Sequence, residues 1–286
     1  MWEYRKNSSL VILGGGNMGG AFARAVERIP FFVSKEQSLH LYIVEPNEEQ
    51  QNRCRKNFPK WKIVAQATDV LNPVALVILA VKPAHAISAL ASVGAQLDET
   101  GLVISCCAGI SLASMTACIS KVSSYSNERS FVRCMPNLGV QVGCGAIAYV
   151  GLSDNQKCPQ MVFALNLLAS MGCAIEVEEK HLDAVTALSG SGPGYFAYIL
   201  EHLEKAGVAL GLDEKVVRQL LIYSLLGTGE LLRGLNVSPS TLREQVTTPQ
   251  GTTAAALEVF SKYSLDIALV EGVRAAATRS NELGKL

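Results

Sequence analysis

The sequence lacks several features by which common classes of protein are identified. Its 286 residues carry 25 basic and 25 acidic side chains, so the formal net charge is zero and we expect no nucleic-acid or membrane partner. No apolar run approaches the roughly 20 residues that a membrane-spanning helix needs. The four histidines are scattered without metal-ligand spacing, and we therefore expect no metal site.

Cysteine is present, but not in the spacing of a disulfide framework or a zinc site. The eight cysteines include no C-x-x-C pair, and Cys106 and Cys107 are adjacent. We expect them to be reduced and mostly buried. The first residues also lack the apolar stretch of a signal peptide, so we expect a cytosolic location.

The first half of the chain alternates strand-like and helix-like patterns. Short apolar runs typical of buried parallel strands are Leu10–Leu13, Leu39–Val44, Ala75–Val81, Leu102–Cys106, Phe131–Cys134 and, further on, Ala146–Val150. Helical patterns are Met18–Arg28, Asn47–Asn57, Ala84–Val93, Leu112–Ile119 and Pro159–Ser170. This alternation predicts an α/β fold with a Rossmann-type, doubly wound sheet over residues 1–172.

From about Lys180 onward the strand patterns give way to long amphipathic stretches. The predicted helices are Ser191–Gly211, Glu214–Arg233, Ser240–Thr247, Thr252–Tyr263 and Leu265–Gly284. They indicate an all-α C-terminal domain over residues 173–286. Their content of Ala, Leu and Gly exceeds what one small bundle needs, so we expect a subunit interface and a homo-oligomer.

A glycine fingerprint follows the first predicted strand. Gly14 permits a tight turn, Gly16 lets the backbone approach a pyrophosphate, and Gly19 allows close helix–sheet packing. A purely structural glycine turn is the alternative. The carboxyl ends of later strands add further candidates. The predicted cofactor-binding residues are Leu13, Gly14, Gly15, Gly16, Asn17, Met18, Glu45, Ala80, Val81, Lys82, Pro83, Cys106, Cys107 and Ala108.

Glu45 ends the second predicted strand, where an acidic residue usually holds the ribose 2′-hydroxyl and favours NAD. Alternatively, Glu45 only caps the helix Asn47–Asn57. Arg53, Arg55 and Lys56, further along that helix, could instead neutralise the 2′-phosphate of NADP. Lys82 is interpreted as a solvated or phosphate-side charge rather than a catalytic base.

Two segments of small residues mark the second half. They are Ser189–Tyr195 and Thr247–Thr253. Such segments expose backbone N–H groups at the starts of helices, where helix dipoles attract anions. Neither contains His, Lys, Cys or a carboxylate, so they indicate a site for a small anionic substrate whose reactive group is supplied elsewhere.

These motifs together resemble the Δ1-pyrroline-5-carboxylate reductase family. The matching segments are the Gly14–Gly19 loop, Ala80–Pro83, Ser105–Gly109, Arg133–Asn137, Asp183–Thr186, Leu188–Pro193 and Leu242–Thr253. The resemblance implies reduction of (S)-1-pyrroline-5-carboxylate to L-proline, the last step of proline biosynthesis, by hydride from NADPH, with NADH as an alternative. It also implies intertwined dimers that share an active site between subunits.

The same resemblance assigns the substrate-binding positions. They are Thr248, Gly251, Thr252, Thr253, Glu179, Thr186 and Ser191. We expect the amides of residues 251–253 to hold the substrate carboxylate, and the hydroxyl of Thr253, the expected catalytic residue, to relay a proton to the ring nitrogen. The structural alternatives are a plain helix cap at Thr248, a helix-packing turn at Ser189–Pro193 and a surface charge at Glu179.

This chain departs from the family pattern at two positions. Gln250 stands where the family usually has the first Gly of Pro-Gly-Gly, and we expect that position to be helical already. Glu45 stands where many relatives carry a small residue that tolerates a 2′-phosphate, which weakens the expected preference for NADPH.

Two other functions fit parts of the sequence. A dehydrogenase of the 3-hydroxyacid type also joins a Rossmann domain to an all-α domain, but it usually needs a Lys or similar base that the small-residue segments lack. A regulatory protein that senses the nucleotide without turnover would need the glycine loop but not Thr253. Replacing Thr253 by Ala would leave such a sensor unchanged.

Overall fold

The structure is a computed structural model that describes residues 7–29, 39–71, 73–123, 129–152 and 158–283. It divides into two compact units, and each is described by itself. The first unit, the sheet unit, comprises Met1–Ser191 with Ala277–Leu286. The second, the helical unit, is Gly192–Ala276.

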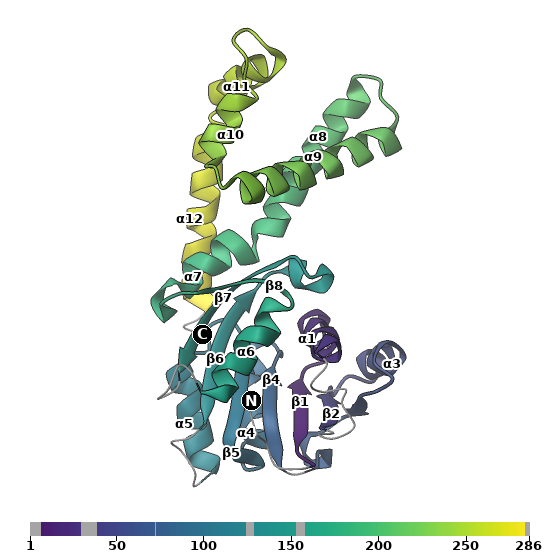
Figure 1. The fold of residues 1–286 in the computed structure, drawn as a ribbon, viewed down its shortest axis with the longest axis vertical. Coiled ribbons are helices and arrows are strands. Elements are labelled where there is room, and N and C mark those ends of the chain that lie inside the picture. Colours follow the sequence, from purple (N-terminus) through teal and green to yellow (C-terminus); the bar gives the residue numbers. More distant parts are fainter. Residues whose placement is uncertain (1–6, 30–38, 72, 124–128, 153–157, 284–286) are drawn as a thin grey trace. The chain divides into compact units, whose positions relative to one another are not determined.

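An eight-stranded sheet forms the centre of the sheet unit (Figure 1). Its order is β3-β2-β1-β4-β5-β6-β7-β8, and only β6 and β7 pair antiparallel among the described strands. The bounds are β1 Ser9–Leu13, β2 His40–Val44, β3 Lys62–Val64, β4 Val74–Leu79, β5 Leu97–Ser105, β6 Ser130–Pro136, β7 Gly145–Leu152 and β8 Gly172–Glu176. The chain adds β2 and β3 on one side of β1 and then β4 and β5 on its other side, and this reversal of strand order makes the sheet doubly wound.

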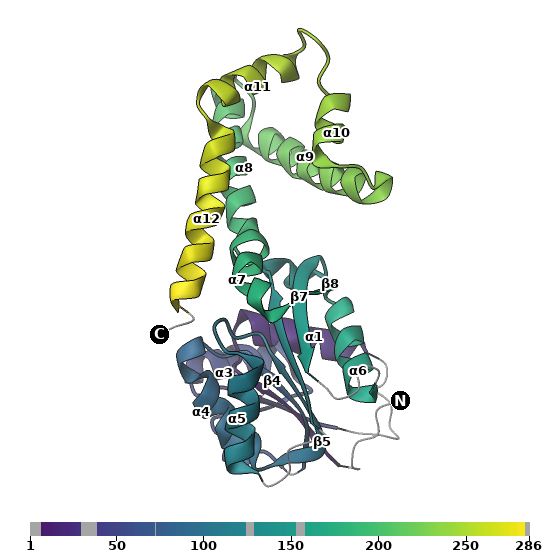
Figure 2. The same ribbon diagram turned by 90° about the vertical axis from the view of Figure 1, so that its left-hand side faces the viewer.

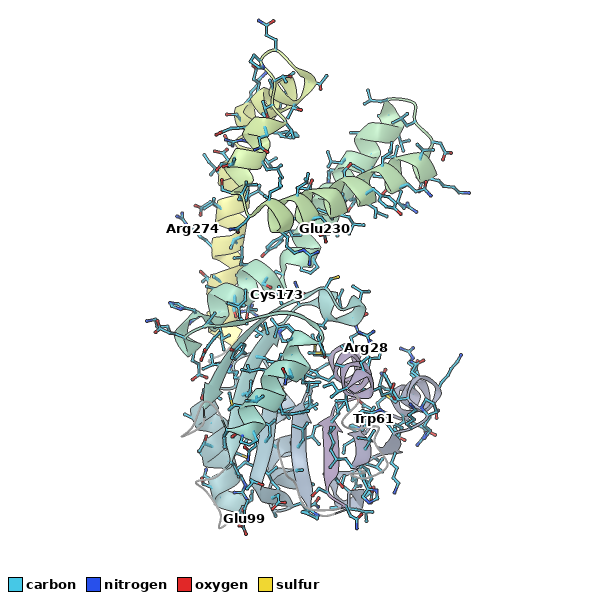
Figure 3. All side chains as sticks on the ribbon, in the orientation of Figure 1. Arg28, Trp61, Glu99, Cys173, Glu230 and Arg274 are labelled. Carbon is cyan, nitrogen blue, oxygen red and sulfur yellow. The ribbon has the colours of Figure 1, made fainter. Side chains whose placement is uncertain are left out.

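Helices cover both faces of this sheet (Figures 1 and 2). One face packs against α1 (Asn17–Arg28), α3 (Glu48–Asn57) and α6 (Pro159–Ala169), and the other against α4 (Pro83–Gly94) and α5 (Leu112–Val122). The central strands are buried on both sides, which explains their continuous apolar sequences. Trp61, labelled in Figure 3, is 5% exposed, and its Nε1 donates to Glu27 Oε1 of α1 at 3.1 Å.

The sheet unit continues past β8 into a short helical segment. A 3₁₀ turn at Glu179–His181 leads to α7 (Leu182–Val185), and a π-helical turn follows at Thr186–Gly190. Asp183 accepts a hydrogen bond from Ser280 Oγ at 2.8 Å, which attaches the end of α12 (Leu265–Leu283) to this unit. The expected domain boundary at residues 172 and 173 therefore falls at the start of β8, whereas the compact unit extends to Ser191.

The helical unit exposes most of its apolar side chains. It contains α8 (Gly192–Ala209), α9 (Glu214–Leu235), α10 (Pro239–Gln245), α11 (Thr252–Lys262) and the greater part of α12. Side chains project from all sides of these helices, as around Glu230 and Arg274 in Figure 3. Leu210 is 83% exposed and Tyr223 is 75% exposed. Apolar surface of this extent marks an interaction site, so this unit is incomplete as a single copy.

The expected fold class, a Rossmann-type sheet followed by an all-α part, is confirmed. The sequence missed β3 and β8, because each is short and partly exposed and therefore lacks a continuous apolar run. None of the helices that the structure describes combines the length and the hydropathy needed to cross a bilayer. In the same described ranges, no three or more His, Cys, Asp or Glu side chains are grouped as metal ligands.

Candidate active site

Three backbone segments leave neighbouring parallel strands at one edge of the sheet. The N–H of Ala80 donates to Leu13 O at 2.9 Å, and the N–H of Cys106 donates to Leu79 O at 3.0 Å. The glycine loop after β1, Ala80–Pro83 after β4 and Cys106–Ala108 after β5 therefore lie together. This is the edge at which open α/β sheets bind ligands. The structure thus brings together the cofactor residues expected from the sequence.

The glycine loop has the geometry that its sequence predicts. Gly14 has φ +101°, and a Cβ there would lie 2.5 Å from Ala80 O. A Cβ on Gly19 would lie 1.9 Å from Gly14 O, so α1 begins in direct contact with the loop. By contrast, a Cβ on Gly16 would meet nothing within 4 Å. The loop is therefore closed on the protein side and open on the ligand side.

The start of α1 offers unpaired backbone donors to this open side. Gly16 is the N-cap, makes no side-chain capping bond, and no acidic residue lies in the first turn. The first intrahelical bond of α1 runs from Gly20 N–H to Gly16 O, so the amides of Asn17 and Met18 have no intrahelical acceptor. Together with the helix dipole they fit the pyrophosphate of a dinucleotide.

Cys106 and Cys107 contribute backbone to the edge, and their sulfur atoms point to protein acceptors. Cys106 Sγ lies 3.3 Å from Leu79 O, and Cys107 Sγ lies 3.2 Å from Val81 O. Burial raises the pKa of both thiols, so neither is an activated nucleophile. Lys82 is exposed and is the N-cap of α4, with Pro83 at the first helical position.

Glu45 does not cap α3, because Asn47 does so. The Oδ1 atom of Asn47 accepts from Gln50 N–H at 2.9 Å. Glu45 instead reaches the glycine loop, where its Oε2 accepts from Gly15 N–H at 2.9 Å. Its Oε1 accepts from Asn47 N–H at 3.0 Å.

Glu179 is tied to a buried arginine that the sequence had not singled out as a site residue. Its Oε1 accepts from Arg133 Nη1 at 2.9 Å and from the N–H of Leu112, at the start of α5, at 2.9 Å. The Arg133 side chain is only 9% exposed, and its Nε has no hydrogen-bond partner among the described residues. An arginine inside the apolar run Phe131–Cys134 was the available signal, because a buried charge needs a partner.

The segment that carries Thr186 and Ser191 is a π-helical turn. The N–H of Ser191 donates to Thr186 O at 2.9 Å, and Thr186 Oγ1 donates to Leu182 O at 2.7 Å. Ser189 Oγ is buried and has no partner within the described ranges. Turns of this type occur frequently at functional sites.

In the helical unit, Thr248–Thr253 form a tight turn at the start of α11. Gly251 N–H donates to Thr248 O at 2.9 Å, and Gly251 is an N-cap without a side-chain capping bond. No acidic residue lies in the first turn. Thr253 is partly buried. The expectation that Gln250 is helical is wrong: its φ of +61° lies in the left-handed region, because the turn needs that conformation to bring Gly251 back to Thr248.

Comparison with known proteins covers both units. Residues 179–283 match a family model described as pyrroline-5-carboxylate reductase dimerisation, and residues 9–109 match one described as NADP oxidoreductase, coenzyme F420-dependent. The chain is 32% identical over 276 residues to the pyrroline-5-carboxylate reductase of Synechocystis sp., which covers 96% of this chain and 98% of the relative. The chain belongs to the pyrroline-5-carboxylate reductase family.

Two further members of this family match nearly the whole chain. The pyrroline-5-carboxylate reductase of Haemophilus influenzae is 33% identical over 284 residues and covers 97% of this chain and 98% of its own length. A crystal structure of Plasmodium falciparum pyrroline carboxylate reductase with NADP bound has a TM-score of 0.79 at 25% identity. That match covers 98% of this chain and 100% of the other.

Membership in this family leaves the alternatives of a 3-hydroxyacid dehydrogenase and a nucleotide sensor without support. It also makes the protein an oxidoreductase that uses NAD(P)H. The match of residues 179–283 to a dimerisation model agrees with the exposed apolar surface of the helical unit, and the protein is a homo-oligomer.

Proposed function

We propose that this protein reduces the C=N bond of (S)-1-pyrroline-5-carboxylate to give L-proline, the last step of proline biosynthesis. The proposal rests above all on similarity to pyrroline-5-carboxylate reductases along nearly the entire chain. The open glycine loop and the uncapped start of α11 supply the two kinds of anion site that this chemistry needs. Residues 1–172 and 173–286 are proposed as the nucleotide-binding and the substrate and dimerisation parts.

The nucleotide would be held at the sheet edge. The amides of Gly16, Asn17 and Met18 would bind the pyrophosphate, Gly14 and Gly15 would shape the loop with their own amides bonded to Val44 O and Glu45 Oε2, and Glu45 would contact the adenine ribose. The remaining contacts come from Leu13, from Ala80–Pro83 and from Cys106–Ala108. When bound, NADH or NADPH supplies the hydride. Deep burial of the strands that end at this edge supports this role, because a rigid sheet fixes the loops that would orient the nucleotide.

The substrate carboxylate is held at the start of α11. The amides of Thr252 and Thr253 would face the ligand, whereas the expected Gly251 amide is already bonded to Thr248 O at 2.9 Å, and Thr248 closes the turn behind them. Hydrogen bonds to a charged group contribute about 1.5–3 kcal/mol each. Two of them, from Thr252 and Thr253, would fix the ring. The absence of a side-chain cap at Gly251 supports this assignment, because the helix leaves these donors to a ligand.

Thr253 is the proposed catalytic residue. Hydride addition moves electron density onto the ring nitrogen, which must therefore be protonated or accept a hydrogen bond in the transition state. The Thr253 hydroxyl would orient the ring and relay a proton to that nitrogen. A stronger acid is unnecessary, since cyclic imines of this kind are protonated by water near neutral pH.

Glu179, Thr186 and Ser191 are proposed as further substrate-binding residues. The π-helical turn and the unpartnered Ser189 hydroxyl support a pocket wall in this segment. For Glu179 the contacts favour an anchoring role, since both of its hydrogen bonds go to the protein through Oε1. Contact with the product's secondary ammonium is the alternative role.

The test is a set of assays that follow the absorbance of the reduced nucleotide. Pyrroline-5-carboxylate and its six-membered analogue are each supplied with NADH and with NADPH. We expect oxidation of nucleotide that depends on the cyclic imine, with L-proline as product. Saturable nucleotide binding without any turnover of either imine would contradict the proposed function.

We also propose a cytosolic location, supported by the eight cysteines, which are all reduced, and testable by cell fractionation.

A further inference from the structure

The end of β2 contacts the glycine loop through a carboxylate with two fixed oxygen atoms. Glu45 Oε2 accepts from Gly15 N–H and Oε1 accepts from Asn47 N–H, at 2.9 and 3.0 Å. The side chain is partly buried and Gly15 is buried. Two backbone donors on different segments therefore hold this carboxylate in one orientation, and Glu45 is not a freely moving surface charge.

Helix α3 completes the attachment of the same glycine. Gln50 Nε2 donates to Gly15 O at 2.6 Å, and Cys54 Sγ lies 3.3 Å from that oxygen. Gln51 Nε2 donates to Glu45 O at 2.7 Å. The N–H group of Gly15 is thus bound by Glu45, and its carbonyl oxygen is bound by side chains of α3. Because a carboxylate has about four acceptor positions, Glu45 can accept ribose hydroxyl groups in addition to its two backbone bonds.

The charged residues that follow Glu45 most closely in the sequence are negative. Glu48 and Glu49 lie in the first turn of α3, immediately after Glu45 and the N-cap Asn47. The first basic residue along α3 is Arg53, whose Nη2 lies 2.6 Å from Glu49 Oε1. Arg55, in the last turn of α3, donates to Asn52 and Gln51. Both arginines therefore have hydrogen-bond partners, and Lys56 lies in the same last turn, at the end of α3 opposite to Glu45.

We propose that Glu45 selects the nucleotide: its fixed carboxylate accepts the ribose hydroxyls of NADH and repels the 2′-phosphate of NADPH. The protein therefore prefers NADH. Glu45 is a specificity-determining residue for the reduction, and this inference rests on the proposed function. A phosphate at this position would place a charge of about −2 next to the carboxylate of Glu45, while Arg53 is paired with Glu49 and Arg55 is bonded to Asn52 and Gln51.

Binding measurements on the full-length protein test the inference directly. Isothermal titration calorimetry with NADH and NADPH gives both dissociation constants without turnover. We expect wild type to bind NADH about tenfold more tightly than NADPH, or better. In Glu45→Gln we expect NADPH to bind more tightly and NADH more weakly than in wild type, with a change in their ratio of about tenfold or more.

Glu45→Asp separates charge from loop attachment. The shorter side chain keeps the negative charge but withdraws from Gly15, so we expect NADH binding to weaken while NADPH remains the poorer ligand. Glu99→Gln is the matched control, because it removes a carboxylate near the amino end of β5, away from the ligand edge (Figure 3). It should leave the ratio of dissociation constants unchanged.

Two outcomes overturn the inference. One is equal or tighter binding of NADPH by wild type. The other is a common loss of affinity for both nucleotides in Glu45→Gln at an unchanged ratio, which would make Glu45 only a support of the loop. Thermal unfolding of the unliganded variants shows that each is folded. If wild type bound neither nucleotide, the proposed function itself would fail. A wrong nucleotide preference differs from this outcome, because both nucleotides would then still bind.

Discussion

The two units of this protein differ in how they bury apolar surface. In the sheet unit, Leu76, Ile78 and Leu102 are all 0% exposed. In the helical unit, Leu220 and Tyr223 of α9 are 57% and 75% exposed. The first unit has a complete core within one chain. The second has apolar helices whose partners must come from another copy, as the match to a dimerisation model indicates.

The proposed anion sites show the same contrast. Both lie at helix starts with a glycine N-cap and without a side-chain capping bond. The start of α1 is held by a buried sheet, with Gly14 in a left-handed conformation at little cost. The start of α11 depends on a local turn in which the exposed Gln250 takes φ +61°. Both proposed sites therefore offer uncapped backbone N–H groups at a helix start, one on a rigid sheet and the other on a locally strained turn.

The largest expected effect tests whether the helical unit needs a second copy. Leu220→Asp combined with Tyr223→Asp places two carboxylates on one face of α9. Burying an unpaired charge costs about 3–5 kcal/mol, so the variant should be monomeric by light scattering. Glu230→Gln, in an exposed pair with Arg233, should retain the wild-type mass. An unchanged mass in the double variant would place the interface elsewhere.

Gly16→Val tests the nucleotide site of the sheet unit. The side chain would occupy the open side of the loop, so nucleotide affinity should fall about a hundredfold or more, equivalent to about 2.7 kcal/mol. A Cβ at Gly16 meets nothing within 4 Å, so the unliganded protein should keep its unfolding free energy within about 0.5 kcal/mol. Gly19→Ala, by contrast, should lower stability as well. Retained affinity in Gly16→Val would refute the fingerprint assignment.

Glu179→Gln tests the buried ion pair within the sheet unit. Removal of the charged partner leaves Arg133 uncompensated, and we expect unfolding free energy in denaturant titrations to fall by about 1–3 kcal/mol. The range extends down to about 1 kcal/mol because the Glu179 side chain is 34% exposed, so that solvent partly screens the ion pair. Arg133→Met with Glu179→Gln should recover part of the loss. Additive losses in this cycle would mean that the two side chains do not interact.

Thr253→Ala tests the chemistry proposed for the helical unit. We expect kcat to fall about tenfold or more, equivalent to about 1.4 kcal/mol, because the hydroxyl that serves the ring nitrogen is lost. Thr253→Ser keeps a hydroxyl and should retain most of the activity. Wild-type kcat in the alanine variant would exclude the proton relay.

The smallest effect concerns the strained turn before α11. Gln250→Gly removes the strain of a left-handed residue but adds backbone entropy to the unfolded chain, so the change in unfolding free energy should stay within about 1 kcal/mol. Gln250→Val, with a β-branched side chain at positive φ, should be clearly less stable in thermal unfolding. Equal stability of the two variants would mean that the turn adopts another conformation.

Much of the fold and of the glycine-loop geometry was predictable because the signals are local. The apolar runs of the central strands are continuous since both sheet faces are covered, and the glycine spacing follows directly from the strand–turn–helix geometry. The cap of α10 is likewise local, because Ser238 Oγ accepts from Thr241 N–H at 3.1 Å. Short, partly exposed strands such as β8 carry no such signal.

The amino-acid sequence alone determined the central strands, most of the helices and the glycine loop, because each depends on residues close together in the chain. Only the tertiary structure decided the partners of charged side chains. Glu45 meets Gly15 across 30 positions, and Arg133 meets Glu179 across 46. Such pairs depend on how strands and helices pack. Burial and hydrogen bonding then determine the role of each charge, because a carboxylate held by backbone donors keeps one orientation, whereas one exposed to water does not.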